Sequence, residues 1–399
     1  MQKILLLGGS YQQIIAIETA KRLGLYTILC DYLPDNPGQY HADKFYQIST
    51  TDKESVFQIA KDESIDYIIA YASDPAAPTA AYVAEKLHLP TNPYNAVDIL
   101  CNKDKFRAFL SSHGYNTPKV LTVEKQENGS VKLDDFSFPI IIKPVDSSGS
   151  KGVTVLYERE NLKAAIEFAF SYSRGHRIII EEYIEKKHPY LIGGDVFISE
   201  GEVIQWGLMN CHRDNRVNPL VPVGKSFPID LDPDDLQRVK DVLQKIVNDL
   251  GIRFGPMNVE LIIDKFNRVF PIDIGPRSGG NMIPDLLGQI FNCDEVELSI
   301  RAAMGQPIDS ITYGGTNCYA SYNLHVDRDG YFSHITVHPE IEKYIIRRNI
   351  YKKAGDEVHF FSNASDVIGI LFFKFPSKEK MIQAEDHMNE YVTIMLQGE

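Results

Sequence analysis

The chain has 399 residues, more than the roughly 100–200 that one ordinary core holds, so two or three packed units are expected. Hydrophobic residues make up 44% and charged residues 24%, which is typical of a globular protein and argues against a disordered chain. Lys and Arg number 41 against 54 Asp and Glu, a net charge of −13. Such an acidic chain disfavours nucleic acids and anionic membrane surfaces as partners.

The apolar runs and the cysteine pattern bear on the cellular compartment of the protein. The apolar run Ile4–Leu7 is shorter than the roughly 7–15 residues of a secretory signal. The later run Val367–Phe373 is far short of the roughly 20 residues that span a bilayer. Five scattered cysteines without a Cys-x-x-Cys pair favour a reducing compartment over disulfides or a zinc knuckle. We therefore predict a cytoplasmic protein.

Residues 1–90 alternate apolar strands with segments of helical spacing. The expected strands are Lys3–Leu7, Tyr26–Leu29 and Asp66–Ala70, and the expected helices are Ile14–Leu23 and Ala76–Leu87. Gly24 follows the first helix, where a left-handed residue commonly ends helices. This alternation predicts a parallel sheet with helices on its faces.

After residue 90 the pattern becomes mixed. The expected helices are Asn95–Gly114, Leu162–Ser173, a helix opened by Asp232-Pro233 and ending near Leu250, and a terminal helix from Ser377. The expected strands are Pro139–Lys143, Val153–Leu156, Ile178–Ile180, Met257–Ile263 and Val269–Ile274, with further strands after Gly315. This order predicts an α+β body behind an α/β front.

One hairpin carries two acids that face each other. The turn Asp264–Arg268 joins two strands, and a register centred on this turn places Glu260 opposite Asp273. The same register pairs Ile263 with Phe270. The other, apolar face then holds Val259, Leu261, Ile272 and Ile274. Facing carboxylates repel each other unless a hard cation such as Mg²⁺ or Mn²⁺ bridges them, or unless water hydrates both acids on an exposed face.

A lysine and a Ser/Gly loop form a second candidate site. Lys143 ends the buried strand Ile140–Lys143, and the loop Val145–Gly152 follows it. A lysine there can neutralise a phosphate, and such a loop can present backbone N–H groups to phosphate oxygens. The segment is not a P-loop, because GxxxxGK[ST] is absent and a strand follows. The alternative is a flexible hairpin with a surface lysine.

Further cations follow these motifs. Arg277, four residues past Asp273, could clamp a carboxylate or a transferring phosphoryl group, or could form an ordinary surface ion pair. Arg213, Arg216 and Lys225 concentrate positive charge in an acidic chain. They predict either a receptor for an anionic substrate or a solvated charged loop.

Taken in order, these segments resemble the ATP-grasp superfamily, above all its biotin-carboxylase-like and purine-biosynthesis-like members, over nearly the whole chain. The resemblance implies a Rossmann-like parallel-sheet domain over residues 1–95 and an ATP-grasp domain over 96–314, with a central lid subdomain at about 138–184. A small sheet-rich closing region is expected over 315–399.

The resemblance also implies roles for individual residues. The ATP-binding set comprises Lys103 and Lys143 as the ATP lysines, Ser147, Ser148 and Lys151 in a mobile phosphate-covering loop, Glu181, Glu182 and Ile184 at the adenine-binding hinge, and His188 near the ribose. Glu260 and Asp273 match the metal ligands, and Arg277 matches the arginine that orients the substrate or acyl phosphate. Arg213, Arg216 and Asn281 are candidate substrate contacts.

One position departs from the family pattern. The family usually has Asn two residues after the second acid, where this chain has Gly275. The departure puts a second Mg²⁺ in doubt, and Asn281 is a candidate substitute ligand.

The implied activity is ADP-forming ligation of a carboxylate to an amine through an acyl phosphate, with ATP and Mg²⁺ (or Mn²⁺) as cofactors. One alternative is a biotin-carboxylase-type enzyme that acts on bicarbonate and uses a separate carrier. Another is a nucleotide-binding regulatory protein with a degenerate site. A dehydrogenase is disfavoured because Gly8-Gly9-Ser10 lacks the GxGxxG spacing, although Asp31 lies near the position of a ribose-binding acid. A homodimer is a further family-based expectation.

Overall fold

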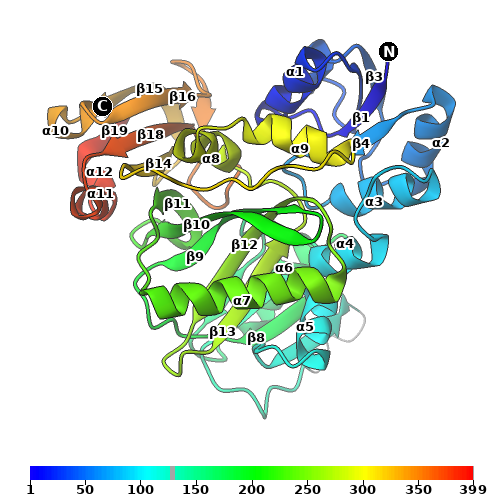
Figure 1. Cartoon of the computed structure of the whole chain (residues 1–399). Helices are drawn as coiled ribbons and strands as arrows, with labels where there is room; N and C mark the ends of the chain where they lie inside the picture. The colour runs from blue at the N-terminus through cyan, green and yellow to red at the C-terminus, as the bar shows by residue number, and fades with distance from the viewer. Residues whose placement is uncertain (126–130, 399) are drawn as a thin grey trace. The chain divides into compact units, whose positions relative to one another are not determined.

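The computed structural model describes residues 1–125 and 131–398 (Figure 1). The chain divides into two compact units. Unit 1 comprises Met1–Pro118, Asp195–Gly207 and Pro233–Thr312. Unit 2 comprises Lys119–Gly194, Leu208–Asp232 and Tyr313–Glu399. The division into three domains expected from the sequence stays a prediction.

Unit 1 begins with a parallel sheet of strand order β3-β2-β1-β4. Its strands are β1 (Lys3–Leu7), β2 (Tyr26–Asp31), β3 (Lys44–Gln47) and β4 (Tyr67–Ile69). Its helices are η1 (Tyr11–Gln13), α1 (Ile14–Arg22), η2 (Pro37–Tyr40), α2 (Lys53–Glu63) and α3 (Ala77–Lys86). In β1, Leu6 packs with Ile17 of α1 while Leu5 packs with Val83 of α3. Both faces of β1 are therefore buried, which explains its uninterrupted apolar sequence.

The rest of unit 1 surrounds one hairpin. Its helices are α4 (Tyr94–Cys101), α5 (Lys103–Ser112), α7 (Pro233–Leu250), α8 (Ile283–Phe291) and α9 (Glu295–Ala303), and the hairpin is β12 (Gly255–Ile263) with β13 (Val269–Gly275). The prediction of one helix over Asn95–Gly114 is wrong. Asn102 has φ −123° and ψ 110°, an extended conformation that separates α4 from α5. The break makes Lys103 the first residue of a new helix.

The largest sheet has the order β13-β12-β9-β10-β11-β14-β18-β16. Its remaining strands are β9 (Leu191–Ser199), β10 (Glu202–Asp214), β11 (Asn218–Phe227), β14 (Cys318–Leu324), β16 (Ile345–Ile350) and β18 (Gly369–Phe375). β9 and β10 each run from one unit into the other, because the unit boundaries fall inside them.

Unit 2 also contains an antiparallel sheet of order β5-β8-β6-β7. Its strands are β5 (Val120–Glu124), β6 (Ile140–Pro144), β7 (Thr154–Leu156) and β8 (Arg177–Glu182). Helix α6 (Leu162–Ser171) contributes Ile166 and Phe170 to a core shared with Ile142 and Ile180. This core fixes β6 and β8, the two strands that carry Lys143 and Glu181.

The C-terminal part of unit 2 is rich in strands, as predicted. Its further elements are β15 (Gly330–Val337), α10 (Pro339–Glu342), β17 (Glu357–Val358), α11 (Lys378–Glu385), α12 (Met388–Tyr391) and β19 (Val392–Leu396). Ser377 caps α11 by accepting a hydrogen bond from the Lys380 N–H, at the predicted start of a helix. That helix is not terminal, however, because β19 follows and pairs with β15.

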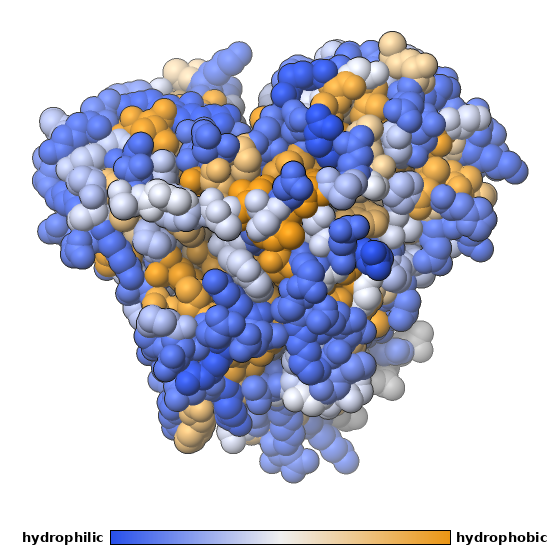
Figure 2. All heavy atoms as spheres, viewed as in Figure 1, coloured by the Kyte–Doolittle hydropathy of each residue, from blue (hydrophilic) through white to orange (hydrophobic). Residues whose placement is uncertain are grey.

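Hydrophilic residues cover most of the face shown in Figure 2, and hydrophobic residues are exposed there in separate groups. Among the described residues, no helix is both long and apolar enough to cross a membrane.

Candidate active site

The hairpin of β12 and β13 places Glu260 directly opposite Asp273, as predicted. The register then slips by one, so the predicted partner of Ile263 is wrong: Ile263 pairs with Val269. Glu260 pairs with residue 273 but its neighbour Leu261 pairs with residue 271, which leaves Ile272 as the extra residue of a β-bulge. Ile272 is consequently half-buried rather than on the buried apolar face.

Helix α5 supports the bulge. Arg107 is 1% exposed and donates from Nη2 to the Ile272 carbonyl (2.7 Å) and from Nη1 to the Pro271 carbonyl (3.3 Å). Lys103 lies four residues earlier, on the same helix face, and its Nζ is 3.0 Å from Oδ2 of Asp273. The helix therefore holds both the backbone and the side chain of this part of β13.

The charge of Lys103 offsets the repulsion between the two acids. Burial acts to lower the pKa of Lys103, but the Asp273 carboxylate, assisted by Asp74, raises it above its ordinary value. Lys103 is therefore protonated beside Asp273 at neutral pH. The Asp273 side chain is still 39% exposed, so its carboxylate remains open to a ligand.

Arg277 follows β13 and pairs with an acid that the sequence analysis missed. Its Nε donates to Oδ1 of Asp74 (2.7 Å) and its Nη2 donates to Oδ2, while Nη1 donates to the Ser278 carbonyl (3.0 Å). Asp74 lies in the segment between β4 and α3. Burial acts to lower the pKa of Arg277, but the Asp74 carboxylate raises it.

A second missed acid holds the loop after Arg277. Asp195 is 5% exposed and accepts hydrogen bonds from the Gly279 N–H (2.7 Å) and from Nδ2 of Asn258 (2.8 Å). Asn258 lies two residues before Glu260 on β12, a spacing that places both on one face of the strand. In the same loop, Asn281 has φ +51° and its N–H donates to Gln12 (3.2 Å).

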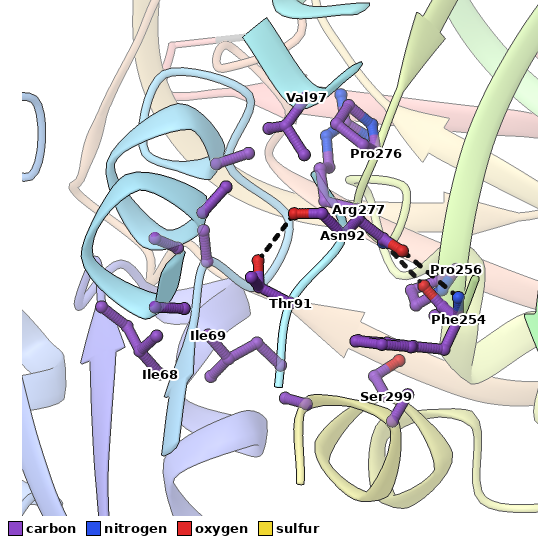
Figure 3. Close-up of a pocket in the computed structure, with 18 of the residues that line it drawn as sticks. Ile68, Ile69, Thr91, Asn92, Val97, Phe254, Pro256, Pro276, Arg277 and Ser299 are labelled. Carbon is purple, nitrogen blue, oxygen red and sulfur yellow. Dashed lines mark hydrogen bonds between the residues drawn. The ribbon is translucent and has the colours of Figure 1, made fainter. Parts of the chain in front are cut away.

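A pocket of about 100 Å³ lies beside Arg277 within unit 1 (Figure 3). Small apolar side chains of α3 line it: Ala77, Ala80, Ala81 and Ala84. Figure 3 shows Asn92 next to Phe254, where Nδ2 of Asn92 donates to the Phe254 carbonyl (2.8 Å). Arg277 is the charged residue among those that line the pocket, so the pocket adds no further charged group to the site.

In unit 2, Lys143 and Glu181 form a buried ion pair. Lys143 on β6 pairs with Ile179 on β8, which places Glu181 diagonally across from it on the same face. Its Nζ is 2.5 Å from Oε2 of Glu181, and the two side chains are 8% and 1% exposed. Two of the residues implied for ATP binding are therefore in contact.

The Ser/Gly loop joins β6 to β7, as predicted. Gly149, Ser150 and Gly152 have φ values of +67°, +63° and +73°. Ser150 donates through Oγ to the Leu220 carbonyl (2.9 Å), and the Gly149 carbonyl accepts from the Ala364 N–H (3.1 Å). The loop is thus a folded turn anchored at two points.

The cations near residue 213 do not lie in one charged loop. Arg213 belongs to β10 and Lys225 to β11, where Lys225 is 7% exposed. Arg216 lies in the turn between these strands and binds Asp214 through Nε (3.1 Å) and Nη2 (2.9 Å). A substrate that binds the Arg216 guanidinium would therefore have to share this group with Asp214.

The predicted residues fall into two sets. Unit 1 holds Lys103, Glu260, Asp273, Arg277 and Asn281, and unit 2 holds Lys143, Ser147, Ser148, Lys151, Glu181, Glu182, Ile184, His188, Arg213 and Arg216. Glu182 and Ile184 are half-buried, at and just beyond the end of β8, and His188 is buried. In unit 1 Lys103 contacts Asp273, which faces Glu260. The roles of both sets stay predictions.

The acids suit a hard divalent ion. No cluster of three or more His, Cys, Asp or Glu side chains arranged for a metal ion occurs among the described residues. Two facing carboxylates supply the oxygen ligands that Mg²⁺ prefers, and phosphate oxygens and water commonly complete its shell. The donor set therefore fits Mg²⁺ bound together with a phosphate.

Asp31 is occupied by the backbone. It accepts hydrogen bonds from the Gly9 N–H (2.8 Å) and the Leu33 N–H (2.9 Å). These bonds give the acid a structural role in the turns after β1 and β2, which removes the support it gave to the dehydrogenase alternative.

Residues 136–285 match the ATP-grasp domain family. The match identifies an ATP-grasp domain in this part of the chain. It is 27% identical to the formate-dependent phosphoribosylglycinamide formyltransferase of Prochlorococcus marinus (strain NATL2A) over 325 residues, or 78% of each chain.

Solved structures show the same fold. The L-amino acid ligase of Bacillus licheniformis superimposes with a TM-score of 0.82 at 20% identity, covering 100% of this chain and 99% of that one. The biotin carboxylase domain dimer of Hydrogenobacter thermophilus 2-oxoglutarate carboxylase, in complex with MgADP and bicarbonate, gives 0.73 at 18% identity, covering 99% and 91%. The predicted fold class is confirmed by these structures, and the resemblance to the ATP-grasp superfamily is confirmed over residues 136–285. The MgADP bound to the carboxylase domain agrees with the predicted use of ATP and Mg²⁺.

Proposed function

We propose that this ATP-grasp protein is an ADP-forming carboxylate–amine ligase that works through an acyl phosphate. The observation that carries the proposal is the pairing of Glu260 with Asp273 across a hairpin, with Lys103 3.0 Å from Asp273. Phosphoryl transfer depends on positioning and charge neutralisation more than on a protein nucleophile, and this arrangement supplies both.

In this proposal, unit 1 carries the metal and acceptor residues. Glu260 and Asp273 would hold Mg²⁺, which when bound neutralises charge on the phosphate oxygens. Lys103 keeps Asp273 in place and adds positive charge to the site. Arg277 orients the acceptor carboxylate, whose oxygen attacks the γ-phosphorus so that ADP leaves.

The second half-reaction forms the amide. The nitrogen of the amine attacks the acyl carbon, the C–O bond to phosphate breaks with its electron pair on phosphate, and the nitrogen loses a proton. The acyl phosphate must be kept from water until the amine arrives. For this purpose we assign Ser147, Ser148 and Lys151, in the turn anchored at Leu220 and Ala364, to the covering of the phosphates.

The remaining unit 2 residues are proposed to bind the nucleotide. Lys143 would bind phosphate oxygens, which then compete with Glu181 for its ammonium group. Glu181, Glu182 and Ile184 are assigned to adenine and His188 to ribose, in agreement with their positions at and just beyond the end of β8.

The substrates are proposed to be a small carboxylate and a primary amine. The relatives support this choice, because one is named for formate and phosphoribosylglycinamide and another as an L-amino acid ligase. Arg213, Arg216 and Asn281 are candidates for substrate contacts. A homodimer in the cytoplasm completes the proposal, and a dimer occurs in the 2-oxoglutarate carboxylase structure.

The test measures Mg²⁺-dependent ADP release with a panel of acid–amine pairs: formate or amino acids as acids, and phosphoribosylglycinamide or amino acids as amines. Bicarbonate with biotin, and ATP alone, are the other arms. Stimulation by an acid–amine pair, with the amide detected by mass spectrometry, supports the ligase. Stimulation by bicarbonate with biotin alone would assign the carboxylase activity instead. Binding of ATP without turnover in any arm would refute the proposal.

A further inference from the structure

Gly275 stands where the family pattern has Asn, and the structure shows what fills the space. A Cβ atom at position 275 would lie 2.4 Å from Oδ1 of Asp74 and 3.1 Å from Nε and Cζ of Arg277. Real Cβ atoms essentially never approach a non-bonded heavy atom of another residue within 3.0 Å. A side chain at this position would therefore require Asp74 to shift from its place in the ion pair with Arg277.

The backbone does not explain the glycine. Gly275 is the last residue of β13 and is not among the glycines with positive φ. An L-residue could therefore adopt its conformation without strain. The reason for glycine is the ion pair beside it.

The ion pair commits one edge of Arg277. Two of its nitrogens bind the two oxygens of Asp74, and the third binds the Ser278 carbonyl. The side chains of Arg277 and Asp74 are 13% and 20% exposed. A two-point pairing fixes the plane of the guanidinium as well as its position, so the remaining N–H bonds point in a defined direction.

We propose that Asp74 is a positioning residue that fixes Arg277 for the acceptor carboxylate, and that position 275 is glycine because this pair occupies the space of a side chain. The inference rests on the proposed role of Arg277 in binding that carboxylate. It gives the departure from the family pattern a cause: the ion pair takes the place of an amide side chain. The departure is thus a rearrangement of the site rather than a sign of degeneration.

The charges near Arg277 agree with this role. Asp273 and Asp195 also act electrostatically on Arg277, and Asp74 acts on Lys103. Without Asp74, Arg277 would keep its attraction to Asp273 but lose its two-point partner. Its guanidinium would then be free to turn toward the metal-binding acid.

A coupling experiment tests the steric half of the proposal. We expect Gly275→Ala to lower the melting temperature by about 4 °C or more, because Cβ collides with Asp74. In an Asp74→Ala background, the same substitution is expected to change it by less than about 1 °C, because the colliding atom is gone. Gly314→Ala is the control, since Gly314 has no neighbour within 4 Å of its Cβ position. Equal shifts in both backgrounds would overturn the steric claim.

Kinetics test the positioning half. Asp74→Asn removes the charge pair, and we expect KM for the carboxylate to rise about 10-fold or more while KM for ATP stays within about twofold. Arg277→Lys cannot form a two-point pair and is expected to raise KM for the carboxylate by a similar factor. The double variant Asp74→Asn/Arg277→Lys is expected to raise KM little beyond either single variant. Equal changes in both KM values, or none, would contradict the positioning role.

The two failures can be told apart. If the wild-type protein releases no ADP with any acid, the ligase proposal fails, but the melting-temperature coupling still decides why position 275 is glycine. If the enzyme is an active ligase and the coupling is absent, the proposal about Asp74 and Gly275 fails alone.

Discussion

The two units hold their charged site residues in different ways. In unit 1 the acids face each other across a hairpin, and the side chain of Asp273 is 39% exposed although Lys103 contacts it. In unit 2 a single acid, Glu181, is 1% exposed and closed against Lys143. The unit 1 acids can therefore accept a further ligand directly, whereas a ligand of Lys143 must compete with a buried partner.

The largest expected effect tests the open acids of unit 1. Glu260→Gln should lower kcat for ADP release about 1,000-fold, or ~4 kcal/mol, because it removes a proposed metal ligand. The melting temperature should stay the same or rise, since the repulsion between Glu260 and Asp273 is relieved. Glu202→Gln, an exposed acid at the start of β10, is the matched control. Wild-type turnover in Glu260→Gln would refute the metal assignment.

Substitutions in the buried Lys143–Glu181 pair of unit 2 should lower the free energy of unfolding. Lys143→Met leaves the buried Glu181 carboxylate without its cation and should lower the free energy of unfolding by about 3 kcal/mol or more in urea titrations. The double variant Lys143→Met/Glu181→Leu should recover most of this loss, because no unpaired charge remains. If the single variant were as stable as the wild type, the contrast between the units would disappear.

Unit 1 also contains a buried acid, Glu295, outside the β12–β13 hairpin, which can be compared with the partly exposed Asp273. Glu295, at the start of α9, is 5% exposed and accepts hydrogen bonds from Gln205 and from Cys293 Sγ (3.2 Å). Burial raises its pKa from 4.5 to about 7.

The folded protein therefore holds this proton over a pH range in which the unfolded chain has lost it. The resulting stabilisation is complete below about pH 4.5 and is lost as the pH rises toward 7, by ~3 kcal/mol in total. Urea titrations between pH 5 and 8 should show this slope in the wild type and a flatter one in Glu295→Gln. A slope shared by both proteins would rule out Glu295 as its source.

The smallest expected effect concerns the support beneath Asp273. Arg107→Met removes two hydrogen bonds to the carbonyls of Pro271 and Ile272 and should lower the free energy of unfolding by ~2 kcal/mol. It should also reduce kcat, because Asp273 loses its fixed position. Arg107→Lys, which has a single donor nitrogen in place of the two that bind the carbonyls, should lie between Arg107→Met and the wild type in both measurements. Unchanged kcat in Arg107→Met would show that the bulge does not need this support.

Local patterns made much of the fold predictable. The apolar run of β1 and the spacing of Ile14–Leu23 report burial within one element, so β1 and α1 follow from the sequence. The break at Asn102 and the final strand β19 were missed. β19 depends on its pairing with β15, about 60 residues away, which local periodicity does not carry.

The same distinction holds for the site. Glu260 and Asp273 share a hairpin, so counting from the turn was enough to pair them. Asp74 lies 203 residues from Arg277, and Asp195 lies 84 residues from Gly279. The bulge at Ile272 was missed for a related reason, since Arg107, which binds it, comes from a helix 165 residues earlier. Long-range partners of this kind leave no periodic trace in one sequence.

The chain changes unit at five places: 118/119, 194/195, 207/208, 232/233 and 312/313. Neither unit is therefore a continuous stretch of polypeptide, and no single truncation of the chain can produce one unit without the other. A chimera that exchanges one half with a homologue needs five junctions, two of them inside β9 and β10. Engineering of such a chain is therefore expected to proceed by replacing side chains rather than by exchanging halves.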